Sequence, residues 1–206
     1  MKKIILTIII GFTLAANCYS QDADRVSPHE IYVGGGVLND NQLLSMVGDF
    51  AATVVTLGQA VQADKYKILT PFVGYRYWFN ERVGVGALFA FDSNSVKALH
   101  SRGGGSLADG EWRVHNRYFY TVAADLNWNY IYRPTFQLYG NVGLGGTLVR
   151  FSDNKTEHPD EQLKQFPYFN MHLSPLGIRF GGQIGGFAEI GWGYKGFFTV
   201  GISAKL

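Results

Sequence analysis

The residues that come nearest to a catalytic set are His172, Ser174 and Glu189. A serine near a histidine, with an acid on the next predicted strand, would supply a nucleophile, a base and an orienting group. Alternation of side chains along a strand predicts otherwise. His172 and Ser174 share a face with Leu176 and Ile178, which is the apolar face, whereas Glu189 falls on the opposite, polar face. We therefore expect no catalytic site here.

The histidines and the glycine-rich run lack the spacing that a metal site or a phosphate-binding loop requires. The histidines lie far apart, without the short intervals of a metal site: His29, His100, His115, His158 and His172. The run Gly103-Gly-Gly-Ser106 lacks the Lys-[Ser/Thr] that completes a phosphate-binding loop, so it is interpreted as flexible linker. The sequence predicts neither a metal nor a cofactor.

Residues 1–20 have the three parts of a secretory signal peptide. Lys2-Lys3 begins it, Ile4–Ala16 forms an apolar core, and small residues place the cleavage after Ser20. The core is shorter than the roughly 20 residues of a membrane-spanning helix, although a retained N-terminal anchor is the alternative. Cys18 is the only cysteine and stands in a loose match to a lipoprotein cleavage box, so its lipidation is a second alternative.

Composition narrows what residues 21–206, the predicted single domain, can be. Removing residues 1–20 takes away two of the 18 basic residues and none of the 16 acidic ones, which brings the net charge to zero. A nucleic-acid partner would favour a basic face, so none is expected. No later run approaches 18 continuous apolar residues, which excludes a transmembrane helix. A secreted β protein and a membrane β-barrel remain.

Eight segments alternate between an apolar and a more polar face, as strands do. In the clearest of them, Val122, Leu126 and Trp128 share one face, and Asp125 and Asn127 share the other. A tilted strand needs about 9–11 residues to cross a bilayer, and these segments suit that length. The predicted strands are Glu30–Leu38, Pro71–Phe79, Arg82–Asp92, Arg117–Tyr132, Thr135–Phe151, Leu173–Phe180, Gly185–Trp192 and Gly196–Leu206.

The connections between these strands alternate in length. Tight turns are predicted at 79–81, 132–134 and 181–183, whereas 39–67, 93–112 and 152–167 are long and the fourth of this series, 194–196, is short. Bacterial outer-membrane barrels have an even number of strands, short periplasmic turns and longer outer loops. The sequence therefore predicts an all-β fold, an eight-stranded antiparallel up-and-down transmembrane β-barrel.

If the apolar faces meet lipid, the polar faces must line a narrow lumen. Charges on a lipid face cost about 2–4 kcal/mol at the midplane, so their sorting to one face is informative. A barrel of eight strands is filled by its own side chains or holds one small ligand. We interpret the polar set as a structural plug made of Glu30, Arg76, Arg82, Asp125, Asn127, Asn129, Arg179 and Glu189, with Gln137, Asn141 and Lys205 beside them.

Aromatic residues gather near the predicted strand ends, where Tyr and Trp favour membrane interfaces. Tyr75, Tyr77, Phe79, Trp128 and Tyr130 are predicted to form the periplasmic girdle, and Trp192 and Tyr194 the outer girdle. An aromatic core in a soluble sandwich is the alternative. In the first long loop, residues from Leu43 to Val61 repeat at helical spacing and predict an amphipathic helix at the barrel mouth or in the outer leaflet, with an extra strand as the alternative.

With these features together, the chain resembles the small outer-membrane β-barrels of the outer-membrane protein A-like and X-like kind. The resemblance covers residues 29–206 and includes the turn Tyr77-Trp-Phe-Asn-Glu-Arg82 and the ending Gly201-Ile-Ser-Ala-Lys-Leu206. Leu206 departs from the aromatic ending that is common there. The resemblance implies an outer-membrane location, contact with outer-membrane lipid, insertion by the barrel-insertion machinery, a monomer and an unspecified surface ligand.

Function follows less directly, because function is carried by sites and not by folds. The first hypothesis is a structural or surface-interaction barrel that is not an enzyme. The second is a narrow channel or a barrel that transports a small hydrophobic ligand. The third is a lipid-modifying enzyme, because His172, Ser174 and Glu189 resemble the set of outer-membrane lipid A deacylases; Pro175 stands where their next motif residue belongs.

Overall fold

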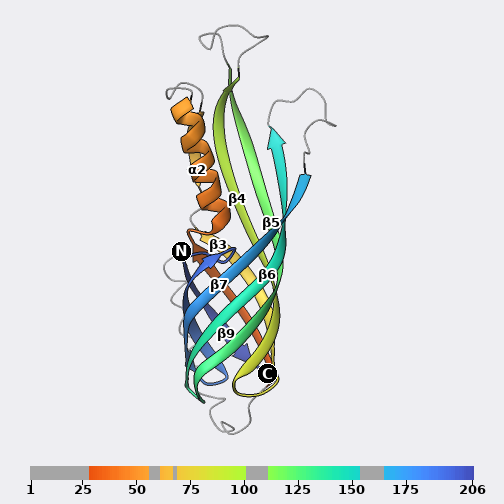
Figure 1. The fold of residues 1–206 in the computed structure, drawn as a ribbon, viewed down its shortest axis with the longest axis vertical. Helices are drawn as coiled ribbons and strands as arrows, with labels where there is room; N and C mark the ends of the chain where they lie inside the picture. Colours follow the sequence, from red (N-terminus) through yellow and green to blue (C-terminus); the bar gives the residue numbers. More distant parts are fainter. Residues whose placement is uncertain (1–27, 56–60, 67–68, 101–110, 154–164) are drawn as a thin grey trace, which may run out of the picture.

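The computed structural model describes residues 28–55, 61–66, 69–100, 111–153 and 165–206 (Figure 1). The predicted signal peptide, with Cys18, and the run Gly103–Ser106 lie outside the described residues. The described elements are β1 (His29–Val37), α2 (Asp40–Val55), β2 (Val61–Tyr66), β3 (Leu69–Trp78), β4 (Val83–His100), β5 (Glu111–Arg133), β6 (Phe136–Asp153), β7 (Gln165–Gly181), β8 (Ile184–Gly193) and β9 (Phe198–Lys205).

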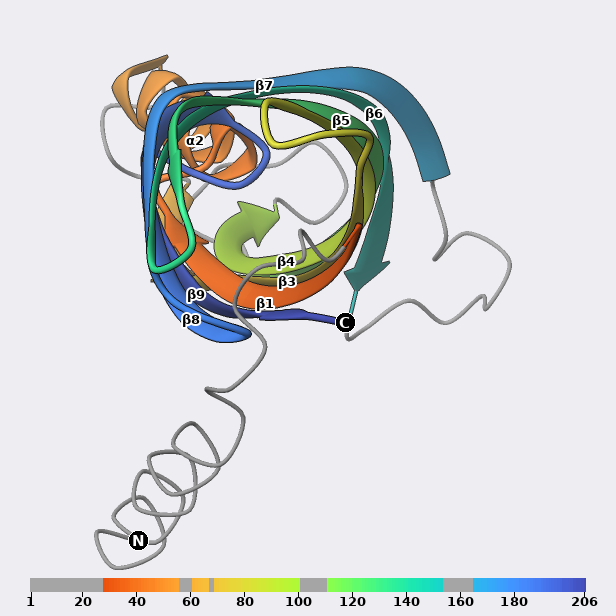
Figure 2. The ribbon, with the colours of Figure 1, turned by 90° about the horizontal axis from the view of Figure 1, so that it is seen from below.

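Eight of these strands form a closed antiparallel ring. Its order is β4-β3-β1-β9-β8-β7-β6-β5, and the pairing of β4 with β5 closes it (Figure 2). The first and last strands of the chain are neighbours: Val33 lies opposite Val73 of β3 on one side and Ile202 of β9 on the other. The predicted eight-stranded antiparallel up-and-down β-barrel is confirmed.

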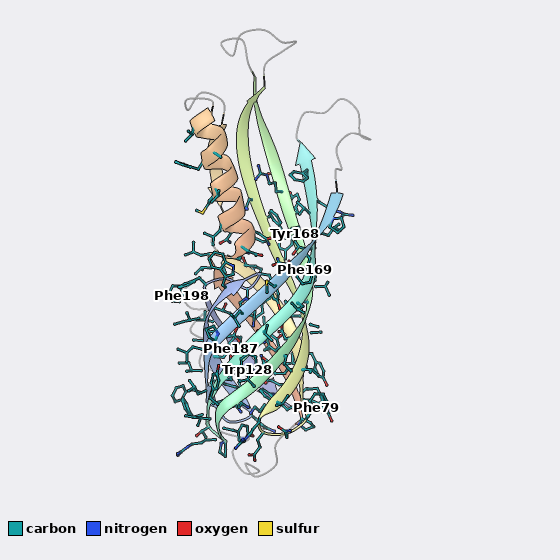
Figure 3. All side chains as sticks on the ribbon, in the orientation of Figure 1. Phe79, Trp128, Tyr168, Phe169, Phe187 and Phe198 are labelled. Carbon is teal, nitrogen blue, oxygen red and sulfur yellow. The ribbon has the colours of Figure 1, made fainter. Side chains whose placement is uncertain are left out.

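Side chains alternate around this ring with the polar face inward. Along β3 every second residue is buried, from Thr70 to Trp78, and the residues between them are exposed. The exposed set is apolar and covers the outside of the ring, from Phe79 at the end with the short turns to Phe198 near the opposite end (Figure 3). We call these the turn end and the α2 end. A water-soluble barrel would place its apolar face inside.

The strands differ in length, and the excess lies on one side of the ring. Strands β1, β3, β8 and β9 have 8–10 residues, whereas β4, β5, β6 and β7 have 17–23. The longer strands continue past the α2 end (Figure 1). Both ends of the predicted loops at 93–112 and 152–167 are therefore strand: 93–100 and 111–112 in the first, and 152–153 and 165–167 in the second. The sequence missed these extensions because the apolar alternation fades there, in segments such as Ser93-Asn-Ser-Val-Lys97.

The first long connection contains both of the structures that the sequence left open. Helix α2 follows β1 in the chain, and β2 then pairs with the C-terminal part of β4, with Tyr66 opposite Asn94. The helix begins at a capping box: the side chain of Asn39 accepts from the backbone of Gln42 at 2.7 Å, and the side chain of Gln42 accepts from the backbone of Asn39 at 3.3 Å.

Candidate functional site

The lumen of the ring gathers most of the predicted polar residues. Each of the following is buried and comes from an inward position of its strand: Glu30, Arg76, Asp125, Asn127, Asn129, Gln137, Asn141, Arg179 and Glu189. Successive residues of a strand point to opposite faces, so residues at every second position of a strand point inward together. The structure thus places nearly all of the predicted set inside the barrel.

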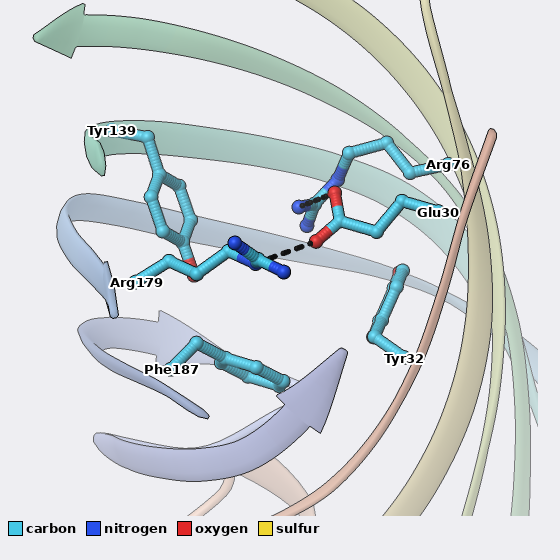
Figure 4. Close-up of a pocket in the computed structure, with 6 residues that line it drawn as sticks. All are labelled: Glu30, Tyr32, Arg76, Tyr139, Arg179 and Phe187. Carbon is cyan, nitrogen blue, oxygen red and sulfur yellow. Dashed lines mark hydrogen bonds and ion pairs between the residues drawn. The ribbon is translucent and has the colours of Figure 1, made fainter. Parts of the chain in front are cut away.

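Glu30 forms the centre of a charged cluster toward the turn end. Its carboxylate lies 3.2 Å from Nη1 of Arg76 and 3.3 Å from Nε of Arg179 (Figure 4). The indole of Trp78 donates to the same carboxylate at 2.8 Å. Arg179 also donates to Ser203 and to the carbonyls of the β7–β8 turn, which fixes its guanidinium. The carboxylate therefore faces two guanidiniums that are themselves held in place.

Aromatic rings surround the Arg76 guanidinium. Its central carbon lies 4.9 Å from the ring centre of Tyr32, 5.4 Å from that of Trp78 and 5.6 Å from that of Tyr139. Phe187 completes the lining, and the space between these side chains is too small for a water molecule (Figure 4). Sequence reasoning did not name Tyr32 or Tyr139 as site residues, although both occupy inward positions in the predicted strands.

A second charged cluster lies nearer the α2 end. Asp125 accepts hydrogen bonds from the hydroxyls of Tyr32 at 3.0 Å and Tyr194 at 2.6 Å. Glu189 accepts from Lys195 at 2.8 Å and from Tyr139 at 2.9 Å. Tyr32 and Tyr139 therefore join the two clusters, because each also lies against Arg76.

Two predicted positions are corrected by this arrangement. Arg82 is exposed: β3 ends at Trp78, and Arg82 lies in the turn that precedes β4, beyond the end of the ring. Tyr194 is not part of the outer girdle, because the β8–β9 turn directs it inward, where it is fully buried. The lumen cation that the sequence missed is Lys195, which lies in the same inward turn.

His172 and Ser174 are also corrected, since both are buried in the lumen and not on the outer face. The register of β7 with β8 shifts between Leu173 and Leu176, so one extra residue reverses the alternation at Pro175. Ser174 donates to the carbonyl of Ile190 at 3.0 Å. The hydroxyl is therefore bonded to the backbone, and it lies inside the ring.

The other predicted aromatic residues lie on the outside of the ring. Tyr75, Tyr77, Tyr130 and Trp192 are exposed, and Trp128 is half-buried beside Tyr130. Tyr75 and Tyr77 both contact His29 near the turn end. The amides Asn127 and Asn141 hydrogen-bond each other inside, and Asn129 donates to the Glu81 carbonyl at the turn end.

A polar cluster joins the first turn of α2 to the mouth of the ring. The side-chain amide of Asn39 donates to Thr70 at 2.7 Å and to Asp92 at 3.0 Å, and Tyr168 hydrogen-bonds Asn41. Burial raises the pKa of Asp40 to about 6, against the opposing effect of hydrogen bonds from the Asn41 backbone and from Asn170. The start of the helix is thereby anchored over the lumen.

The described part of the chain contains no group of three or more His, Cys, Asp or Glu side chains arranged to hold a metal ion. Among the same residues, no helix has the length and apolarity to cross a bilayer.

No protein-family model matches the chain, and no curated protein matches it. Two solved structures are similar in outline, both of Ail, the attachment invasion locus protein of Yersinia pestis. One, in complex with the heparin analogue sucrose octasulfate, has 17% identity and a TM-score of 0.42 over 85% of this chain and 92% of that one. The other has 16% identity and a TM-score of 0.39 over 86% and 95%.

Proposed function

We propose that this chain is an integral outer-membrane β-barrel with a closed lumen, which presents a surface for interaction and is not an enzyme. One observation carries the proposal: the closed ring has its apolar residues outside and its ion pairs inside. Charged residues are absent from membrane midplanes unless they face the interior of the protein. Within the described strands, Glu30, Arg76, Asp125, Arg179 and Glu189 all do so.

The lumen supports the closed form of the proposal. Glu30, Arg76 and Arg179 occupy it toward the turn end, and Asp125, Glu189 and Lys195 occupy it toward the α2 end. Charged groups in a low-dielectric interior resist separation from their partners, so a passage through both clusters would be costly. This favours a side-chain-filled barrel over the channel and ligand-transport alternatives.

The interaction surface is the part that rises past the ring. Strands β4–β7 continue there, and β2 and α2 lie beside them (Figure 1). Strands of about 9–11 residues suffice to cross an outer membrane, so the additional residues of β4–β7 are available outside it. The predicted girdle residues Tyr75, Tyr77, Trp128, Tyr130 and Trp192 are proposed to lie at the membrane interfaces, and the protein is proposed to be monomeric.

A pair of matched substitutions tests the membrane position. Val200 of β9 and Val54 of α2 have nearly the same exposure, 60% and 57%, but Val200 lies on the ring and Val54 lies beyond it. If lipid surrounds the ring, Val200→Arg costs up to about 2–4 kcal/mol, the value for a charge at the midplane, and lowers the folded fraction in outer-membrane extracts, whereas Val54→Arg does not. The folded form is read from its mobility on unheated gels.

A soluble protein would tolerate both changes, because both side chains would already face water, and that result would reject the proposal. Loss of folding in both variants would place α2 in the outer leaflet. Protease added to intact cells supplies the second readout: cleavage is expected only in the segments between β2 and β3, β4 and β5, and β6 and β7, and in the segment around α2.

A further inference from the structure

The β8–β9 turn directs two large polar side chains into the barrel. Tyr194 and Lys195 are 0% and 1% exposed, although they lie in a four-residue connection at the rim. Gly193 and Gly196 flank them with φ of 126° and 115°, a conformation that favours glycine and reverses the chain inward. The turn thus carries its own ammonium group and phenol into the lumen.

The recess that receives these groups is rich in acceptors. The Lys195 ammonium lies 2.8 Å from Glu189, which also accepts from Tyr139, and the Tyr194 hydroxyl lies 2.6 Å from Asp125, which also accepts from Tyr32. The ammonium of Lys195 is therefore paired with Glu189, and the phenol beside it is paired with Asp125.

Two further observations show that the turn occupies a recess built around it. A side-chain carbon added at Gly36 of β1 would lie 1.6 Å from the Lys195 carbonyl, and one added at Gly143 of β6 would lie 1.8 Å from the Tyr194 hydroxyl. Glycines at these positions leave the room that the turn fills. The fully buried His172, whose ring centre is 5.1 Å from that of Tyr194, has no hydrogen-bond partner for either ring nitrogen among the described residues.

From these contacts we infer that the recess lined by Asp125, Glu189 and His172 is a binding site for a primary alkylammonium group, and that Lys195 fills it as an internal ligand. Buried polar groups are normally hydrogen-bonded, so once the Lys195 ammonium is removed, an entering ammonium would restore the donor that Glu189 loses. The inference goes beyond the proposed function, since it depends on the lumen geometry and not on the membrane.

Chemical rescue tests the site directly. Lys195→Ala removes a propylammonium-sized piece of the side chain and leaves Glu189 buried without its cation. The variant is refolded into detergent micelles, and its urea midpoint is measured with n-propylammonium chloride or with tetramethylammonium chloride at the same concentration. We expect a lowered midpoint that n-propylammonium restores by at least half, with saturation, while tetramethylammonium does not, because it has no N–H to donate.

Three controls make the assignment specific. The wild type should not respond, because its site is filled, and Lys195→Ala/Glu189→Gln should not respond, because its acceptor charge is gone. Lys205→Ala should not respond either: that ammonium lies at the other end of the lumen, 5.1 Å from the ring centre of Tyr132. An equal response in any control, or rescue by tetramethylammonium, overturns the inference.

If Lys195→Ala does not fold in plain buffer, its refolding in the two salts tests the inference instead. If Lys195→Ala refolds only when n-propylammonium is present, the site is supported, and if it refolds in neither salt, the recess does not accept an external ammonium and the inference is wrong. A wild type that refolds normally but is absent from outer-membrane extracts would instead count against the proposed function and leave the site standing.

Discussion

Glu30→Gln is the substitution that most directly tests the lumen as a structural plug. It keeps the size of the side chain and an oxygen that accepts from the Trp78 indole, but it removes the charge that faces two buried guanidiniums. Arg76 and Arg179 would then be left in the lumen with no carboxylate between them. Arg82→Gln is the matched control, because that arginine is exposed in the β3–β4 turn.

The expected cost follows from burial. Breaking a buried ion pair by removing one partner costs about 3–5 kcal/mol, because the remaining charge is desolvated and unpaired. Glu30 is 0% exposed and serves two arginines, so we expect at least the lower limit of that range. Substitution of an exposed surface charge changes stability by about 0.5 kcal/mol or less. The two variants should therefore differ by at least a factor of about 60 in the unfolding equilibrium constant.

The measurement is urea unfolding in lipid vesicles, followed by tryptophan fluorescence and by the shift in mobility on unheated gels. A triple variant, Glu30→Leu/Arg76→Met/Arg179→Met, completes the test, because an apolar replacement of the whole cluster should recover most of the loss. Equal stability of Glu30→Gln and Arg82→Gln would refute the plug. A triple variant as unstable as Glu30→Gln would show that shape, and not charge pairing, makes the cluster necessary.

Two further predictions concern the α2 end. Gly36→Ala should lower the free energy of unfolding by about 1–3 kcal/mol, because its added carbon meets the Lys195 backbone. Gly186→Ala is the control: the atom nearest to its added carbon is 3.9 Å away, so its free energy of unfolding should change by no more than about 0.5 kcal/mol. Urea midpoints compare the two variants. The pKa of Asp40, raised by burial to about 6 from 3.8, means that the folded state holds this proton more tightly, so its stabilising effect is full below about pH 4 and is lost as the pH rises through 6. Relative to Asp40→Asn, the wild type should gain about 1 kcal/mol between pH 7 and pH 5, measured by unfolding or by hydrogen exchange in α2, and identical pH profiles would contradict the burial of this carboxyl.

The ring could be predicted from the sequence because its strands obey one rule throughout. Where every second residue points out of the ring, as from Leu69 to Trp78, the apolar alternation identifies the strand and its inward face. The rule fails at Pro175, where one extra residue reverses the faces and moves His172 and Ser174 inward. It also fails past the ring, where both faces of β4 are polar and no alternation marks the strand.

The membership of the lumen was predictable, but its pairing was not. Alternation places Glu30, Arg179 and Glu189 inside without stating which of them meet, because that depends on the stagger of strands around a closed ring. In the structure Arg179 forms an ion pair with Glu30, and Glu189 forms one with Lys195. Lys195 could not be predicted as a lumen residue because it lies in a turn, where strand alternation does not indicate which way a side chain points.

The charges of the lumen bear on where recognition takes place. The Glu30 cluster has more cations than carboxylates, because Arg76, Arg179 and the neighbouring Lys205 lie beside one glutamate, whereas Asp125 and Glu189 outnumber Lys195 in the other cluster. Tyr32 and Tyr139 connect them by touching both. A change in either cluster therefore alters the electrostatic field at the other. Because the extensions are confined to β4–β7, we expect any partner to be met on that one side of the barrel.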